Sequence, residues 1–153
     1  VFCAPVHPLA QRGCATTEEL AGQEWIVREA GSGTRETFDQ ALRLLDWRPQ
    51  IRLELEHTEA IKRAVEFGLG IGCLSRLALR EAFRRGSLVA VETPALDLRR
   101  HFHFLWHARK FQTAGMREFV TLCRTMTAGV QRSEQIDWPT IVETRMPGNE
   151  MSR

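Results

Sequence analysis

Short apolar segments with strand character alternate with segments that have the spacing of amphipathic helices, roughly every 25 residues. This alternation restricts the fold more than any other feature, because it is typical of βαβ units with right-handed crossovers. The sequence therefore predicts an α/β fold with a mostly parallel sheet and helices on both faces. The predicted strands are 1–5, 24–29, 51–56, 71–75, 87–92 and 99–108, and the predicted helices are 16–23, 34–45, 59–69, 76–86 and 114–126.

Composition and charge exclude several classes of protein. The 21 basic and 19 acidic residues are interspersed and give a net charge of +2, so no basic stripe of a DNA-backbone-binding module is present. The four cysteines lack the close spacing of a zinc site or a redox pair, which favours a reducing compartment. No apolar run reaches membrane-spanning length and no leader opens the chain. The chain begins with Val1 rather than with a methionine. We therefore expect this sequence to be a piece of a longer protein.

Candidate ligand-binding residues follow two of the predicted strands, 24–29 and 51–56, and lie around a third, 71–75. In an open α/β sheet, ligands bind beyond the carboxyl ends of the strands. Two of these connections lead directly into helices, whose first N–H groups lack internal partners and carry partial positive charge. The sequence therefore predicts a site for a small anion. Its candidate residues are Ser32, Gly33, Thr34, Arg35, His57, Thr58, Gly72 and Cys73.

Each of the polar candidates also has a purely structural interpretation. Ser32 or Thr34 could cap its own helix while the glycines supply a turn, and Thr58 could be the N-cap residue of the next helix. Thr17 is a similar N-cap candidate for the helix 16–23. His57 could favour an anion when charged, or be a partly exposed loop histidine. Arg35 could be a solvated side chain. From the residues alone, these alternatives stay open.

The remaining polar clusters indicate neither a metal site nor an active site. His101, His103 and His107 share one face of a predicted strand, but His107 would lie about 13 Å from His103, which is too far for a common metal ion. No nucleophile motif is present, and no pair of carboxylates projects from neighbouring strand ends. We therefore predict no metal, no cofactor and no enzymatic activity.

The order of motifs over about residues 1–125 resembles the effector-binding region of LysR-type transcriptional regulators. The resemblance is carried by HPLA, WIVREAGSGTRETFDQAL, LELEHTEAIKRAVEFGLGIGCLSRLAL, RRGSLVAVE and REFVTLC. Its most specific part is TEAIKRAVEFGLGIGCLS. Within the family, REAGSGTR together with GLGIGCLS is most similar to the branch linked to sulfur-oxyanion and related assimilation control.

This resemblance implies a two-lobed domain like the type 2 periplasmic binding proteins, with a small effector, often an anion, between the lobes. Residues 1–97 would form the second lobe, 98–128 a strand and helix returning toward the first lobe, and 129–153 a C-terminal extension or tail. Most of the first lobe would be absent, as would the N-terminal winged helix-turn-helix, through which alone the full-length protein would bind DNA. The family also implies a cytoplasmic homo-oligomer, a dimer or tetramer, that is not an enzyme and does not associate with membranes.

By position, the resemblance places the pocket edge of the second lobe on Ser32 to Arg35, on His57 and Thr58, and on Gly72 with Cys73. The family thus points to the same residues as the sheet geometry. Two alternatives share this type of fold. One is the lobe of a solute-binding protein of a transport system, and the other is a small α/β enzyme acting on a phosphorylated or carboxylated substrate.

Overall fold

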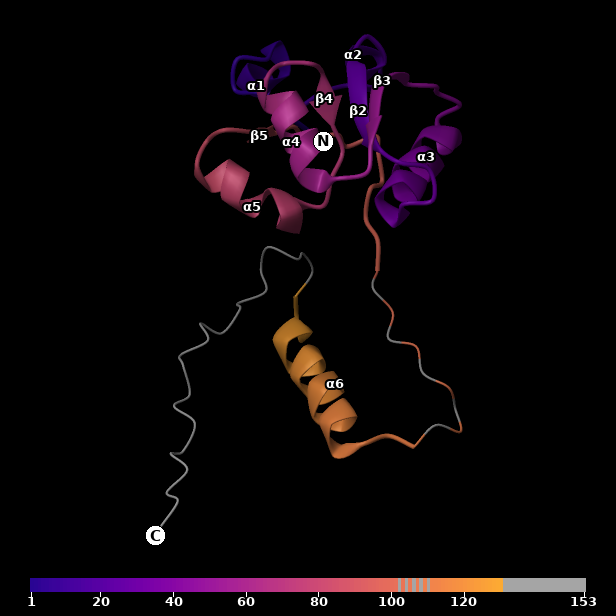
Figure 1. Ribbon diagram of the computed structural model, residues 1–153. Coiled ribbons are helices and arrows are strands. Elements are labelled where there is room, and N and C mark those ends of the chain that lie inside the picture. Colours follow the sequence, from indigo (N-terminus) through magenta and orange to yellow (C-terminus); the bar gives the residue numbers. More distant parts are fainter. Residues whose placement is uncertain (102, 104, 106, 108, 110, 131–153) are drawn as a thin grey trace. The chain divides into compact units, whose positions relative to one another are not determined.

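The computed structural model describes residues 1–101 and 111–130, together with residues 103, 105, 107 and 109. The chain divides into two compact units, Val1–Leu105 and Trp106–Arg153. The first unit contains a sheet with helices packed around it, and the second contains one described helix (Figure 1). Each unit is described by itself below.

Strands and helices alternate through most of the first unit, as the sequence predicts. In chain order its elements are β1 (Phe2–Cys3), α1 (Pro8–Arg12), α2 (Thr17–Ala21), β2 (Glu24–Arg28), α3 (Gly33–Leu44), β3 (Gln50–Leu55), α4 (Thr58–Glu66), β4 (Ile71–Gly72), α5 (Arg76–Arg84) and β5 (Val89–Ala90).

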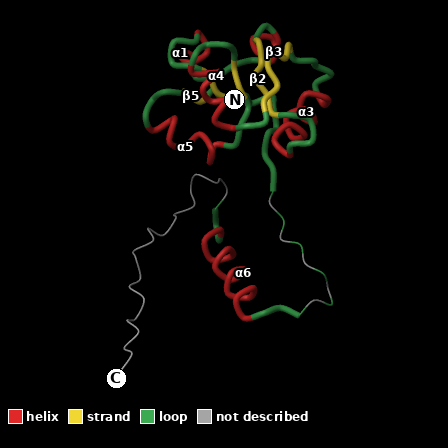
Figure 2. The backbone as a smooth tube through the Cα atoms, in the orientation of Figure 1, coloured by secondary structure: helices red, strands yellow, loops and turns green. Residues whose placement is uncertain are grey.

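The sheet has the strand order β3-β2-β4-β1-β5. The central strand β2 pairs in parallel with β3 on one side and with β4 on the other. The strand β1 is antiparallel to both of its neighbours, β4 and β5. Four of these strands therefore run in one direction and only β1 opposes them. The consequence for function is that β3, β2 and β4 present their carboxyl ends at the same edge of the sheet. Figure 2 shows the neighbouring strands β2 and β3 side by side.

Successive side chains of β2 point into two different hydrophobic cores. Trp25 and Val27 belong to a cluster formed with α1, α2 and α3, whereas Ile26 between them belongs to a cluster formed with α4 and α5. Since successive strand residues point to opposite faces, the two clusters lie on opposite sides of the sheet. Trp25 is fully buried, and its Nε1 donates to the carbonyl oxygen of Leu20 at 3.3 Å. The prediction of an α/β fold with helices on both faces is confirmed.

Two local features near the N-terminus differ from the prediction. The short helix α1 was not predicted, although His7 is its N-cap residue and Pro8 occupies the first helical position, where proline is favoured. The N-cap residue of α2 is Thr16 rather than Thr17. The Thr16 hydroxyl accepts from the Glu19 N–H at 3.4 Å while Glu19 Oε2 accepts from the Thr16 N–H at 2.9 Å, which completes a capping box.

The strand predicted over 99–108 is not observed at its described residues, none of which lies in a strand. Residues 102, 104, 106 and 108 of that prediction lie outside the described residues. Among the described residues, no cluster of three or more His, Cys, Asp or Glu side chains could hold a metal ion.

The helix predicted near 114–126 is confirmed as α6 (Ala114–Thr127) in the second unit. It has an apolar stripe at helical spacing that includes Met116, Val120 and Cys123, yet none of its residues is buried. Of the predicted tail 129–153, residues 131–153 lie outside the described part. None of the described helices combines the length and apolar character needed to cross a bilayer.

Candidate functional site

The loops that carry the predicted site residues all lie at the carboxyl edge of three adjacent parallel strands. The strand β2 leads through residues 29–32 into α3, β3 leads through 56–57 into α4, and β4 leads through 73–75 into α5. Because β3, β2 and β4 are neighbours in the sheet, the starts of these three helices meet at one edge. This arrangement brings the Ser32–Arg35 and His57–Thr58 segments to the same carboxyl edge of the sheet, although α3 and α4 pack on opposite faces.

The three helix starts at this edge lack side-chain caps. The N-cap residues Ser32, His57 and Ser75 form no side-chain hydrogen bond to the first turns of α3, α4 and α5. By contrast, the side chains of His7 and Thr16 cap α1 and α2. The first backbone N–H groups of α3 and α4 are therefore not satisfied by the residues that would ordinarily cap them.

This geometry decides between two of the alternatives that the sequence leaves open. Ser32 occupies the N-cap position of α3, but its side chain does not make the capping hydrogen bond that a purely structural role requires. Thr58 is the first residue of α4 rather than its N-cap, which is His57, so the prediction that Thr58 caps the helix is wrong. The His57 backbone carbonyl accepts from the Ile61 N–H at 3.1 Å, which begins the helix.

The glycine turn before α3 is open rather than covered. Gly31 has a φ of 87°, a left-handed conformation that glycine adopts at little cost, and a Cβ built on it would meet nothing within 4 Å. The turn is held from the side by Glu54 on β3, whose Oε1 accepts from the Ala30 N–H at 3.3 Å. The sequence reasoning missed Glu54, because its contact with the turn links residues that are far apart in the chain.

Arg35 holds the framework of the site together. Its Nη1 donates to Glu54 Oε2 at 2.7 Å and to the Arg28 carbonyl oxygen at 2.8 Å, while its Nε lies 2.9 Å from Asp39 Oδ1. Burial opposes the charge of Arg35, but the bonds to Glu54 and Asp39 outweigh this effect and raise its pKa. The guanidinium therefore ties α3 to β2 and β3. The predicted contact of Arg35 with a ligand stays a prediction.

The hydrogen bonds from Arg35 and from the Ala30 N–H also lower the pKa of the Glu54 carboxyl. A carboxylate with a lowered folded-state pKa stabilises the fold above its unfolded-state pKa, and this contribution is lost as the pH falls through the folded-state value. The link between Glu54 and the turn is therefore intact at neutral pH and weakens only in acid.

His57 lies within electrostatic range of the turn before α3. The bidentate hydrogen bonds from Arg28, both 2.7 Å long, are the main reason that the pKa of Glu29 is lowered. A smaller part of the same lowering comes from the charge of His57. His57 is exposed. The loops after β2 and β3 therefore lie near each other.

Gly72 and Cys73 have neighbours that explain both residues through packing. A Cβ on Gly72 would lie 2.5 Å from Cζ of the fully buried Phe2 ring, so only glycine fits there. Cys73 is buried in the cluster that contains Trp25. Burial raises the pKa of its thiol, and the positive charges of the N-terminus and of Arg100 act in the opposite direction. Contact of Gly72 or Cys73 with a ligand stays a prediction.

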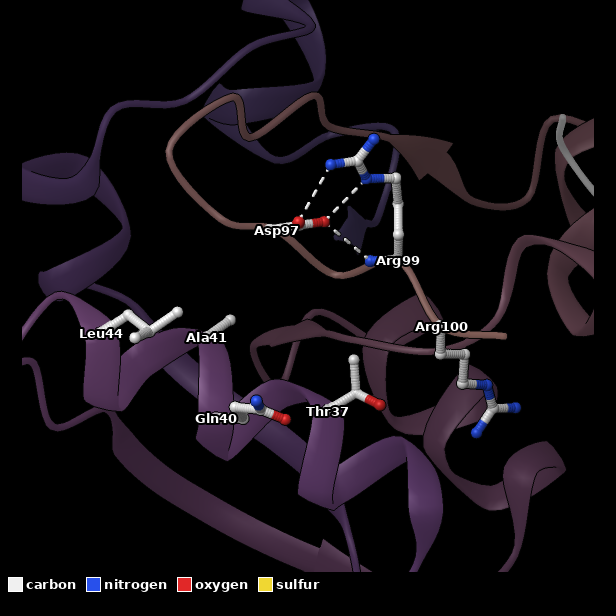
Figure 3. Close-up of a pocket in the computed structure, with 7 residues that line it drawn as sticks. All are labelled: Thr37, Gln40, Ala41, Leu44, Asp97, Arg99 and Arg100. Atoms are coloured by element: carbon white, nitrogen blue, oxygen red, sulfur yellow. Dashed lines mark hydrogen bonds and ion pairs between the residues drawn. The ribbon is translucent and has the colours of Figure 1, made fainter. Parts of the chain in front are cut away.

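Arg100 is a further cationic residue at this edge that the sequence reasoning missed. Its Nη1 lies 3.4 Å from the position that a Cβ on Gly33 would occupy, which places the guanidinium beside the first turn of α3 (Figure 3). Arg100 follows the last strand by ten residues, and no local motif connects it to the turn. Only the path of the folded chain brings it there.

The family model described as LysR substrate binding domain matches residues 1–128. The HTH-type transcriptional regulator YeiE of Escherichia coli strain K12 is 42% identical over 123 residues, which are 80% of this chain and 42% of that protein. CysL of Bacillus subtilis, also an HTH-type transcriptional regulator, is 29% identical over 78% of this chain and 40% of its own length. The chain thus spans less than half the length of these relatives.

Two solved structures of regulatory or effector-binding domains have a fold similar to that of this chain. The regulatory domain of Synechocystis PCC6803 CcmR, solved in complex with 2-PG, superposes with a TM-score of 0.72 and is 26% identical. The match covers 84% of this chain and 62% of that domain. The effector-binding domain of QuiR in complex with shikimate has a TM-score of 0.57 at 19% identity, over 78% of this chain and 56% of that one, which shows likeness of fold alone.

Proposed function

Because the chain belongs to the LysR substrate-binding domain family, we propose that it is the effector-sensing part of a bacterial transcription regulator that binds a small anion at the carboxyl edge of β3, β2 and β4. A regulatory role agrees with the named relatives, which are transcriptional regulators rather than enzymes or transport proteins. It also agrees with the small molecule bound to the regulatory domain of CcmR.

One observation carries the anion proposal: adjacent helix starts at a single sheet edge lack side-chain caps. The N-terminus of a helix carries about half a positive elementary charge and directs its free N–H groups outward. At α3 and α4 these groups receive no capping bond from Ser32 or His57. A carboxylate or small oxyanion would satisfy them.

We assign different roles to the residues of the site. The backbone amides of Gly33 and Thr34, with the hydroxyls of Ser32 and Thr34, would bind the anion directly. His57 and Thr58 would contact it from the start of α4. Arg35 and Glu54 would keep the turn in place.

The regulatory mechanism requires parts of the protein beyond this chain, which spans 42% of YeiE. An effector held between this lobe and a first lobe would favour one arrangement of the two lobes through its higher affinity for that arrangement. The apolar stripe of α6 would then pack on the first lobe, and residues 98–128 would form the return toward it. The full-length protein would bind DNA and form a dimer or tetramer. It would be located in the cytoplasm.

The effector itself would be a small anion. The branch of the family concerned with sulfur oxyanions, indicated by REAGSGTR with GLGIGCLS, makes sulfate and related ions the first candidates to test. The structural argument for an anion does not depend on that branch.

Isothermal titration calorimetry of the 153-residue chain with sulfate, phosphate and acetate, at constant pH and ionic strength, tests the proposal. We expect saturable binding of at least one of these anions. One anion should bind per chain, because the uncapped backbone amides lie together at one edge of the sheet. Sodium chloride at the same ionic strength is the control. Heats that do not saturate for any anion would reject the proposed site.

A further inference from the structure

Lys62 is the one charged residue that is buried among the residues that the structure describes, with 9% of its surface exposed. It belongs to α4, which packs together with α5 on one face of the sheet. Its Nζ donates to the carbonyl oxygen of Ala78, in the first turn of α5, at 3.4 Å. Since a buried ammonium group is costly unless its charge is paired, Lys62 needs an acidic partner.

This partner is Glu59, which lies in the first turn of α4. Lys62 Nζ is 2.5 Å from Glu59 Oε1, and the spacing of the two residues places them on the same side of the helix. The Lys62 side chain is 11% exposed, whereas the Glu59 side chain is 76% exposed. The buried ammonium, which also contacts Ala78, is therefore the fixed member of the pair, and it determines where the exposed carboxylate lies.

The position of the Glu59 carboxylate matters for the proposed anion site, because Glu59 directly follows Thr58 at the start of α4. A carboxylate in the first turn is attracted to the positive end of its own helix, and it can accept from the free N–H groups that an anion would bind. Glu19 in the first turn of α2 does this, since its Oε2 accepts from the Thr16 N–H at 2.9 Å. Glu59 differs from Glu19 because its Oε1 is held by Lys62.

From this geometry we infer that Lys62 is a positioning residue of the anion site, which holds the Glu59 carboxylate away from the first amides of α4 and neutralises its charge. These amides then stay available to the ligand, and the acidic side chain beside them does not repel it. The inference rests on the proposed anion site and adds to it a residue that acts on the ligand only through Glu59.

Calorimetric titration of the 153-residue chain and its variants with sulfate, phosphate and acetate, at constant pH and ionic strength, tests this role. Lys62→Met keeps an unbranched apolar stem in the buried position and removes the charge. The released Glu59 carboxylate, about 6 Å from an anion at an effective dielectric constant of about 20, should weaken binding roughly tenfold or more. In the double variant Lys62→Met/Glu59→Gln the affinity should return to within about threefold of wild type, because the repelling charge is gone.

Arg63→Met is the matched control for the change in net charge. Arg63 belongs to the same helix and forms an ion pair of the same spacing, with its Nη1 2.7 Å from Glu66 Oε2. This pair lies away from the site, since Glu66 ends α4 and Thr58 begins it, about 12 Å away along the helix axis. Arg63→Met should therefore weaken anion binding less than about threefold.

Glu59→Asp is a second test that leaves the net charge and every buried residue unchanged. The side chain of Asp is one methylene group shorter, and the ammonium of Lys62 is held by the Ala78 carbonyl oxygen and cannot follow it. The carboxylate then stays near the first amides of α4, and anion affinity should fall about threefold or more. If circular dichroism shows that Lys62→Met does not fold, Glu59→Asp decides alone, and unchanged affinity in it overturns the inference.

The other outcomes separate this inference from the proposed function. A folded Lys62→Met chain that binds anions as tightly as wild type overturns the inference, as do equal losses in Lys62→Met and Arg63→Met. A loss in Lys62→Met that Glu59→Gln does not restore also overturns it, because Lys62 would then act through packing or direct contact. All of these results leave the anion site itself intact. If none of the three anions binds the wild-type chain, both proposals are wrong.

Discussion

Thr34→Asp is expected to abolish binding of small anions while leaving the chain folded. The new carboxylate would lie in the first turn of α3, about 4–6 Å from an anion held by the amides there. At an effective dielectric constant of about 20, repulsion between two such charges costs about 3–4 kcal/mol, which corresponds to a loss of affinity on the order of 100-fold or more. The new carboxylate would also accept hydrogen bonds from the same amides and so compete with the ligand.

The stability of Thr34→Asp should stay unchanged or increase slightly, although its affinity for anions falls. An acidic residue in the first turn of a helix stabilises it by about 0.3–1 kcal/mol through the helix dipole. Thermal unfolding should therefore show an unchanged or slightly higher midpoint, so that lost binding cannot be attributed to unfolding.

Thr17→Asp is the matched control for Thr34→Asp. It adds the same charge to the first turn of α2, where the capping box of Thr16 and Glu19 already satisfies the free amides. We expect anion affinity to change less than threefold in this control. Equal losses in both variants would indicate a general effect of charge, and unchanged affinity in Thr34→Asp would remove the α3 amides from the site.

Gly72→Ala is expected to have the largest effect on stability among the site candidates. The added Cβ would lie 2.5 Å from Cζ and 2.7 Å from Cε1 of Phe2, a ring that has no exposed surface and cannot move without repacking its cluster. Overpacking of this kind costs about 1–3 kcal/mol, a large part of the 5–15 kcal/mol that stabilises a typical domain. Urea denaturation should show a lower midpoint with an unchanged slope.

Two companion variants test whether the loss comes from the Phe2 contact. Gly22→Ala makes the same substitution where the nearest atom is 3.8 Å away, and should change stability by less than about 0.5 kcal/mol. In the double variant Phe2→Leu/Gly72→Ala the loss should be smaller than the sum of the two single losses, because the smaller side chain gives room to the new methyl group. Strict additivity would contradict the packing role of Gly72. A folded Gly72→Ala protein that fails to bind anions would instead support its predicted role as a ligand contact.

The sequence predicts most of the fold because local patterns encode most of it. The consecutive apolar residues Trp25, Ile26 and Val27 indicate a buried strand, and this pattern is visible without coordinates. The antiparallel direction of β1 is not visible, because two buried residues, Phe2 and Cys3, look the same in either orientation. The helix α1 is too short to show a hydrophobic period.

The candidate site, like the fold, can be predicted only in part from the sequence. The turn with Gly31 and the starts of α3 and α4 are local features, and the rule that ligands bind at the carboxyl ends of strands brings them together. Glu54 and Arg100 could not be predicted, since their contacts with the turn depend on the tertiary path of the chain. The distinction between a capped and an uncapped helix start at Ser32 also depends on the side-chain conformation, which the residue type does not determine.

The central claim is that the first amides of α3 hold a small anion at an edge shared with the start of α4. The most direct test is a titration of the ¹⁵N-labelled 153-residue chain with sulfate, phosphate and acetate, followed by amide chemical shifts. For an anion that binds, we expect the amide signals of Gly33 and Thr34 to shift saturably, together with those of Thr58 and Glu59, and with one common dissociation constant. Shifts that are linear in anion concentration, or saturable shifts confined to other parts of the chain, would contradict this account.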